Sequence, residues 1–159
     1  YWRRIPGMWV HGDWASRDAD GCWYIHGRSD DTIKLAGKRT GPAEIEAALI
    51  ATQRVGDAAA VGVPDPVKGS AVVCAVVPRP GQPPGGDLAA LLSEAVGDAM
   101  GAAYRPKRIL FVSDLPRTRN MKVMRRVIRA AITGEPAGDL TALVNPEAVE
   151  ELRRAAHGE

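Results

Sequence analysis

Basic side chains are concentrated in one part of this sequence. Between Arg105 and Arg129 there are nine lysines and arginines and one acid, Asp114, so this segment carries a formal charge of +8 (9 − 1), whereas the whole chain carries +2. Such a concentration of positive charge favours a polyanionic ligand, either nucleic acid or a phosphorylated cofactor. The alternative is a solvated basic helix face that binds nothing.

Polar residues also form three clusters that could carry chemistry. The first is Gly12-Asp13, which lies inside an aromatic segment. The second runs from Gly27 to Arg39 and the third from Leu115 to Arg126. Each cluster lies where a strand-like segment gives way to a loop, and loops are where binding and catalytic side chains are most often presented.

Several common site signatures do not occur in the sequence. The pair Gly37-Lys38 lacks the Ser or Thr that follows it in a phosphate-binding P-loop, and no GxGxxG or GxSxG stretch is present. His11, Cys22 and His26 have no good fourth partner for zinc, so we predict that this chain binds no metal.

The elements that must position these clusters follow from the spacing of apolar residues. Residues 8–27 contain two aromatic and β-branched runs around a polar turn, which predicts a β-hairpin. We predict helices over 42–52, 88–100, 123–132 and 145–156, strands over 58–63, 71–77 and 108–112, and a loop or short strand over 28–41. The fold class is therefore α+β, a small β-hairpin followed by a compact domain with a short, about three-stranded sheet and packed helices.

Length and composition are typical of a single soluble domain. The chain has 159 residues, of which 45% are hydrophobic and 25% charged. No apolar stretch is long enough to cross a bilayer, and Cys22 and Cys74 are expected to be reduced thiols, so we predict a cytoplasmic protein that does not bind membranes. The sequence begins with Tyr1 rather than Met, and we expect a piece of a longer protein.

All three clusters resemble signature stretches near the C-terminus of the adenylate-forming (AMP-binding) enzymes. Within that superfamily, acyl-CoA synthetases of the acetyl-CoA synthetase type are most similar. Four motifs in the family's order carry the resemblance: Gly27-Arg28-Ser29-Asp30-Asp31, Gly41-Pro42-Ala43-Glu44-Ile45-Glu46, Gly62-Val63-Pro64-Asp65, and a tail with Gly138-Asp139-Leu140 and Asn145-Pro146-Glu147. The resemblance runs from about Trp9 to about Leu152, nearly the whole chain.

The resemblance implies a two-step reaction. Such enzymes join a carboxylic acid to ATP, usually with Mg²⁺, to form an acyl-adenylate, and then transfer the acyl group to coenzyme A. It also implies that residues 1–29 are a hairpin that ends a missing N-terminal domain and approaches the hinge, and that residues 30–159 are the mobile C-terminal domain. The N-terminal domain, the expected partner, holds most of the active site, so this chain alone is expected to be inactive.

The resemblance also implies roles for individual residues. Asp13 matches the aspartate that binds the ribose hydroxyls of ATP, and Arg28 matches the arginine that meets nucleotide phosphate. Asp30 is at the hinge position. Gly37 matches a glycine that lines the pantetheine tunnel for CoA, and Arg39 is expected to approach a ligand phosphate. Without the resemblance, Gly37 and Arg39 would be read as an ordinary turn with a solvated arginine.

Lys122 is the expected catalytic residue. In the family, this loop lysine reaches the carboxylate of the acid and the α-phosphate during adenylation. Two positions depart from the family's pattern. Met121 replaces a glycine, so either the loop differs or the parent enzyme is divergent. Gly97 replaces an arginine that some relatives place near the 3′-phosphate of CoA, and Arg105 or Lys107 would have to compensate.

Two other classes of function compete with the ligase. The chain could be a recognition module for a lysine acetyltransferase and its deacylase acting at Lys122, because acetylation would remove the charge of this lysine. The surface read by such an enzyme would be basic: Arg117, Arg119, Arg125 and Arg126. Nucleic-acid binding is disfavoured, since the basic segment contains only one aromatic residue, Phe111, with Tyr104 directly before it.

Overall fold

The structure, a computed structural model, describes residues 5–29, 31–35 and 37–158. The predicted hinge residue Asp30 lies outside the described residues. The elements are β1 (Asp13–Arg17), β2 (Trp23–Arg28), β3 (Ile33–Leu35), β4 (Lys38–Thr40), α1 (Pro42–Ala51), β5 (Val55–Asp65), β6 (Gly69–Pro78), α2 (Gly86–Met100), a single 3-10 turn (Ala102–Tyr104), β7 (Arg108–Phe111), α3 (Arg125–Thr133) and α4 (Pro146–His157).

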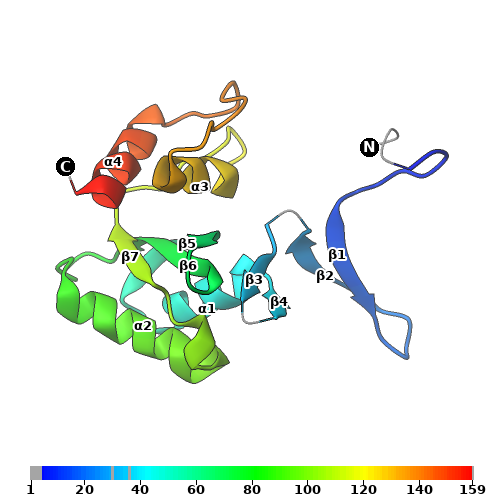
Figure 1. Cartoon of the computed structure of the whole chain (residues 1–159), viewed down its shortest axis with the longest axis horizontal. Helices are drawn as coiled ribbons and strands as arrows, with labels where there is room; N and C mark the ends of the chain where they lie inside the picture. Colours follow the sequence, from blue (N-terminus) through cyan, green and yellow to red (C-terminus); the bar gives the residue numbers. More distant parts are fainter. Residues whose placement is uncertain (1–4, 30, 36, 159) are drawn as a thin grey trace.

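A three-stranded sheet forms the centre of the domain, in the order β5-β6-β7. Strands β5 and β6 are antiparallel, whereas β7 runs parallel to β6 after the crossover through α2. Buried residues alternate between the two faces of β5 and β6, which explains their nearly continuous apolar sequences. Helices α1 and α2 cover one face, and α3 and α4 cover the other (Figure 1). The α+β prediction is thus confirmed.

The β1–β2 hairpin projects away from this body (Figure 1). Its large apolar side chains face outward: Trp14 and Trp23 are 45% and 67% exposed, and Trp9, which precedes the hairpin, is 54% exposed. The prediction of a strand at residues 8–10 was wrong, because pairing begins only at Asp13. Residues 8–10 are bracketed by Gly7 and Gly12, whose positive φ angles of 75° and 88° turn the chain out of an extended path.

A second hairpin, β3–β4, follows the predicted hinge position. The sequence predicted a loop or short strand here, and two three-residue strands form, in which Ile33 pairs with Thr40 and Leu35 with Lys38. Ile33 and Leu35 are buried against the α1–α2 side of the sheet, so this small hairpin is anchored to the body by its inward side chains.

The last two helices begin in ways that the sequence did not fully predict. Helix α3 starts at Arg125 and not at Val123, because Val123 forms an isolated bridge with Arg117. Helix α4 starts at Pro146 as predicted, but the Asn145 side chain makes no capping hydrogen bond. No helix in the described part of the chain is both long and apolar enough to span a membrane.

Candidate functional site

Asp13 and Arg28 face each other across β1 and β2. They are paired directly in the strand register, and Arg28 Nε lies 3.9 Å from Asp13 Oδ1. Arg28 Nη1 also donates a 3.1 Å hydrogen bond to the carbonyl oxygen of His11, whose ring contacts Asp13. The hairpin therefore presents a carboxylate, which accepts from a diol, beside a guanidinium, which donates to phosphate.

Lys122 lies on a tight loop between β7 and α3, residues 118–122, which we call the lysine loop. The amide of Met121 donates to the Thr118 carbonyl at 2.8 Å, and the amide of Thr118 donates to the Lys122 carbonyl at 2.9 Å. Met121 has a φ of 59°, the left-handed region that glycine adopts without steric cost. The loop thus has the conformation that a glycine would favour, and we expect methionine here to cost about 1 kcal/mol.

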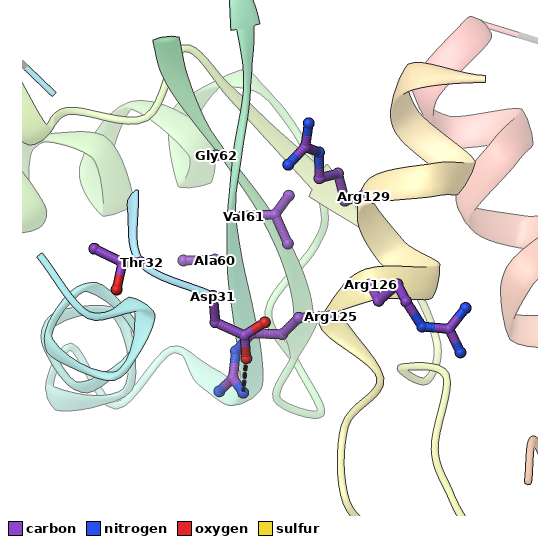
Figure 2. Close-up of a pocket in the computed structure, with 8 residues that line it drawn as sticks. All are labelled: Asp31, Thr32, Ala60, Val61, Gly62, Arg125, Arg126 and Arg129. Atoms are coloured by element: carbon purple, nitrogen blue, oxygen red, sulfur yellow. Dashed lines mark ion pairs between the residues drawn. The ribbon is translucent and has the colours of Figure 1, made fainter. Parts of the chain in front are cut away.

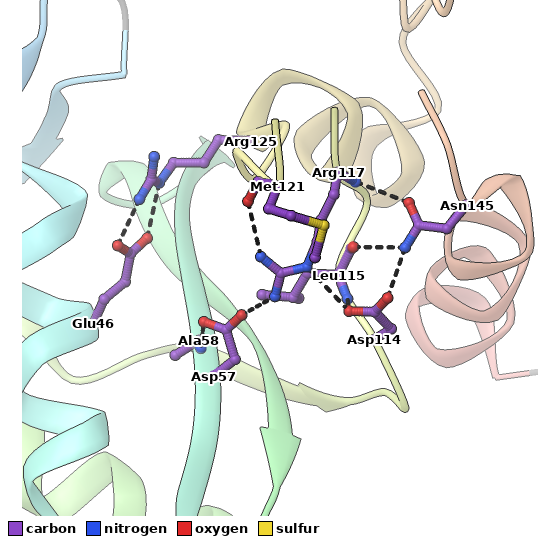
Figure 3. A network of polar contacts seen from close by, with 9 residues as sticks. All are labelled: Glu46, Asp57, Ala58, Asp114, Leu115, Arg117, Met121, Arg125 and Asn145. Atoms are coloured by element: carbon purple, nitrogen blue, oxygen red, sulfur yellow. Dashed lines mark hydrogen bonds and ion pairs between the residues drawn. The ribbon is translucent and has the colours of Figure 1, made fainter. Parts of the chain in front are cut away.

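Arg117 joins this loop to two other segments (Figure 3). Its guanidinium donates through Nη1 to the Met121 carbonyl at 3.1 Å, through Nε to Asp114 Oδ1 at 3.3 Å, and through Nη2 to Asp57 Oδ2. Only 16% of its side chain is exposed. Asn145 completes the network, since its Oδ1 accepts from the Arg117 amide at 2.9 Å and its Nδ2 donates to Asp114 Oδ2 and the Leu115 carbonyl.

Arg125 anchors the other end of the loop. It makes a two-pronged contact with Glu46 of α1, at 2.8 Å from Nε and 2.6 Å from Nη2, and Glu46 also accepts from the Ala60 amide. Hydrogen bonding to Glu46 raises the pKa of Arg125 above its ordinary value, although burial opposes this shift. In Figure 2 the Arg125 guanidinium also points toward Asp31, with Nη1 3.7 Å from Oδ2. Arg125 therefore connects the lysine loop to the segment that follows the hinge position.

A small cavity of about 210 Å³ lies next to Arg125 (Figure 2). Its walls come from the segment after the hinge position, the middle of β5, and the first two turns of α3: Asp31, Thr32, Ala60, Val61, Gly62, Arg125, Arg126 and Arg129. The adjoining hollow of about 570 Å³ reaches the β1–β2 hairpin and gathers Lys34, Arg39 and Arg129 with Trp14.

Gly37 and Arg39 are exposed residues of the β3–β4 hairpin. Gly37 has a φ of 78° directly before Lys38 of β4, so the backbone at this position requires a residue that tolerates the left-handed region. A Cβ at Gly37 would meet no atom within 4 Å. The guanidinium of Arg39 lies 5.9 Å from the centre of the Trp14 ring, within range of a cation–π contact with the first hairpin.

Arg105 and Lys107, the two residues predicted to replace the CoA-binding arginine that Gly97 lacks, have different environments. Lys107 Nζ is 2.7 Å from Asp65 Oδ2, and this hydrogen bond, together with the amides of Lys68 and Val67, lowers the pKa of Asp65 to about 2. No acidic side chain among the described residues forms an ion pair with Arg105, and the Arg105 side chain passes directly over Gly97. Of the two, Arg105 is the cation that a ligand could recruit without breaking an ion pair.

The structure brings together only some of the predicted site residues. Asp13 and Arg28 are neighbours, whereas no hydrogen bond or ion pair between described residues joins Lys122 to them or to the β3–β4 hairpin. The sequence did not predict which side chains hold the lysine loop in place: Arg117, Arg125, Glu46 and Asn145. The described residues contain no group of three or more His, Cys, Asp or Glu side chains that could hold a metal ion.

Comparison with known proteins decides the family. Residues 44–122 match the AMP-binding enzyme C-terminal domain. The chain is 44% identical over 155 residues to an acetyl-coenzyme A synthetase of Pyrobaculum aerophilum, and those residues cover 98% of this chain and 23% of that enzyme. Residues 44–122 belong to the AMP-binding enzyme C-terminal domain family. Most of α1, strands β5 to β7 and the lysine loop as far as Lys122 lie within the matched residues, whereas the β3–β4 hairpin precedes them.

Other relatives of this AMP-binding C-terminal domain differ in the acid that their names state. A 3-hydroxypropionyl-coenzyme A synthetase of Sulfurisphaera tokodaii is 43% identical over 155 residues, 98% of this chain and 23% of that enzyme. The crystal structure of an anthranilate CoA ligase in complex with anthranoyl-AMP superimposes with a TM-score of 0.68 and 34% identity, over 76% of this chain and 23% of that one. The chain spans about a quarter of the length of these proteins.

Proposed function

We propose that this chain is the C-terminal catalytic domain of an ATP-dependent short-chain acyl-CoA ligase of the acetate–CoA type. In this proposal it supplies the adenylation lysine, Lys122, and the CoA-side loop around Gly37. The observation that carries the proposal is the lysine loop, where an exposed lysine follows a left-handed residue and is held between two arginine anchors, Arg117 and Arg125. A flexible solvated lysine would need no such support.

The proposed chemistry of adenylation is electrostatic. The acid's carboxylate attacks the α-phosphate of ATP, and negative charge reorganises over both groups while pyrophosphate leaves. The ammonium of Lys122 would stabilise that charge, and a positioned cation of this kind lowers a barrier by roughly 3–4 kcal/mol. Asp13 would accept from the ribose hydroxyls, and Arg28 would donate to a nucleotide phosphate beside it, which the 3.9 Å pairing of the two side chains supports.

We further propose that the domain swings about Asp30 between two half-reactions. Residues 1–29 would stay with the N-terminal domain, the partner of this chain, and residues 30–159 would rotate as a unit. The exposed tryptophans of the β1–β2 hairpin support this division, because such apolar surface is usually covered by a partner. Lys122 and Gly37 lie on different loops, so the lysine loop could serve adenylation and the β3–β4 hairpin could serve thioester formation.

ATP, with Mg²⁺ bound to its phosphates, and coenzyme A would be the cosubstrates. The β3–β4 hairpin would border the pantetheine of CoA at Gly37, and Arg39 would approach a ligand phosphate. Arg105 would replace the cation that Gly97 lacks. We expect the enzyme to work in the cytoplasm, where ATP and CoA are available.

A second candidate function involves the same lysine. Lys122 and its neighbours Arg119 and Asn120 are exposed around a hollow of about 660 Å³, which also supports recognition by a lysine acetyltransferase and a deacylase. Acetylation at Nζ would remove the charge that the first proposal requires. The two functions are compatible, since modification would switch the ligase off.

The test uses the full-length enzyme that carries this chain, with the two half-reactions assayed separately. Lys122→Ala is expected to slow acid-dependent pyrophosphate release by about 10²–10³-fold and to leave thioester formation from supplied acyl-adenylate within about 2-fold. Lys68→Ala, which removes an exposed lysine from the β5–β6 turn, serves as the control and should change neither half-reaction. Equal slowing of both halves by Lys122→Ala would overturn the assignment. The 159-residue chain alone should release no pyrophosphate above background.

A further inference from the structure

Arg117 is the residue through which the lysine loop is attached to the body of the domain. Its three guanidinium nitrogens each have a different acceptor: the Met121 carbonyl, the Asp114 carboxylate and the Asp57 carboxylate. The Met121 carbonyl belongs to the peptide bond that leads into Lys122. Asp57 lies 60 residues earlier in the chain, on β5. The guanidinium therefore connects the backbone beside the lysine to the central sheet.

A guanidinium is suited to this position because its donors lie in one rigid plane. When three acceptors are fixed around that plane, the position and the tilt of the group are both determined. A lysine at the same place would offer a point charge on a flexible stem, and it could not hold the Met121 carbonyl in a defined direction. Because only 16% of the Arg117 side chain is exposed, solvent screens these contacts less than it would on the surface.

Asn145 fixes the other side of the same segment. Its side chain accepts from the Arg117 amide at 2.9 Å and donates to Asp114 at 2.8 Å and to the Leu115 carbonyl at 2.9 Å. Asn145 is only 8% exposed, so its amide is committed to these partners rather than to water or to the helix that it precedes. The amide of Val144 also donates to the Arg117 carbonyl at 3.1 Å. The start of α4 thereby supports the strand-like stem of the lysine loop.

We infer that Arg117, held by Asp57 and Asn145, is a positioning residue for the adenylation step. This inference rests on the proposed function of Lys122. Arg117 does not touch the substrate; it sets where the peptide before Lys122 lies, and hence where the ammonium group reaches. Displacing a catalytic group by about 1 Å can lower a rate by about 10²-fold. The contacts of Arg117 matter for the half-reaction that uses Lys122 and not for the half-reaction that uses the β3–β4 hairpin.

The experiment compares Arg117→Gln, Asp57→Asn and Asn145→Ala with a control, Arg153→Gln, in the full-length enzyme. Arg153 is an exposed arginine of α4 that forms an ion pair with Glu150 on the same helix. We expect Arg117→Gln to lower kcat for pyrophosphate release by about 10–10²-fold with little change in the KM for ATP, and to leave thioester formation within about 2-fold. Asp57→Asn and Asn145→Ala should have smaller effects in the same direction, and Arg153→Gln should have none.

Rescue separates positioning from a loss of folding. Arg117→Lys shortens the cationic side chain, and Asp57→Glu lengthens the acidic one, so the double variant can restore the ion pair but not the contact with the Met121 carbonyl. We therefore expect the double variant to recover the melting temperature while adenylation stays slow. If the double variant recovered the adenylation rate together with the melting temperature, Arg117 would be only structural.

The outcome for Lys122→Ala distinguishes the two proposals. If Lys122→Ala abolishes adenylation but Arg117→Gln leaves it unchanged, the positioning role is wrong and the proposed function stands. If Arg117→Gln slows both half-reactions equally, the positioning role is also wrong. If Lys122→Ala itself has no selective effect, the proposed function fails, and with it the inference built on Arg117.

Discussion

The side chain of Arg105 occupies the space that a side chain at Gly97 would need. A Cβ built on Gly97 would lie 2.3 Å from Arg105 Nε and 2.8 Å from its Cγ, closer than non-bonded atoms approach. Gly97 is in α2, and Arg105 follows the short 3-10 turn after that helix. The Arg105 side chain therefore covers position 97. Positions 97 and 105 cannot both carry long side chains unless the structure rearranges.

The first prediction concerns the proposal that Arg105 replaces the CoA-binding arginine that some relatives carry at the position of Gly97. In the full-length enzyme, Arg105→Ala is expected to raise the KM for CoA by about 10-fold, because one charge-assisted contact with a CoA phosphate is lost. Pyrophosphate release should be unchanged. Gly97→Arg combined with Arg105→Ala should recover much of the affinity, because the new arginine enters the vacated space. Steady-state kinetics with CoA as the varied substrate measures both. An unchanged KM in Arg105→Ala would mean that this arginine does not contact CoA.

The second prediction concerns the strained position in the lysine loop. Met121→Gly is expected to stabilise the chain by about 1 kcal/mol, because glycine adopts a φ near 59° without steric cost. For a chain of this length, that is a rise of roughly 2–4 °C in Tm. Gln53→Gly provides a matched comparison at φ 60° after α1, and Asn120→Gly provides a control whose φ is not positive. Thermal unfolding measures all three. A Tm that falls in Met121→Gly would contradict the strain.

The third prediction separates two reasons for glycine at position 37. The turn requires φ near 78°, which asparagine tolerates better than leucine, whereas a passing ligand would be blocked by either side chain. If Gly37 borders the CoA tunnel, both Gly37→Asn and Gly37→Leu should slow thioester formation by about 10-fold or more while pyrophosphate release survives. If Gly37 serves only the turn, Gly37→Asn should behave like the wild type.

The fourth prediction concerns acid stability. Asp65 accepts from Lys107 and from the amides of Val67 and Lys68, and its pKa falls from 3.8 to about 2. Because the folded-state pKa is lowered, the stabilisation is complete above about pH 4 and is lost as the pH falls from 3.8 toward 2. Asp65→Asn should therefore lower Tm at neutral pH and flatten the fall of stability over that window.

The matched control for this measurement is Asp98→Asn, which alters an exposed acid near the end of α2. It should leave the slope of stability against pH unchanged. Urea unfolding at a series of pH values between 2 and 7 would resolve the difference. If Asp65→Asn and the wild type lose stability in parallel over the acidic window, the Lys107–Asp65 contact does not stabilise the fold.

The sequence by itself determined the elements and the family. Alternating or continuous apolar residues specified β5, β6 and β7, prolines marked the first turns of α1 and α4, and separated motifs placed Lys122, Asp13 and Arg28 in a known pattern. These features depend on local propensity and short spacing, which the order of residues states directly. Residues 8–10 were misjudged because aromatic and β-branched residues favour a strand there, while the flanking glycines turn the chain.

Only the tertiary structure decided how the lysine loop is held. Arg117 meets Asp57 across 60 residues and Arg125 meets Glu46 across 79. Glu46 belongs to a family motif, but neither spacing nor motif indicates which residue pairs with which. Asn145 reads in sequence as a helix cap, yet its side chain turns to Asp114 and Leu115. These pairings exist because α1, β5 and the start of α4 pack around one sheet. Which charges become neighbours therefore depends on the packing of both faces and not on their positions along the chain.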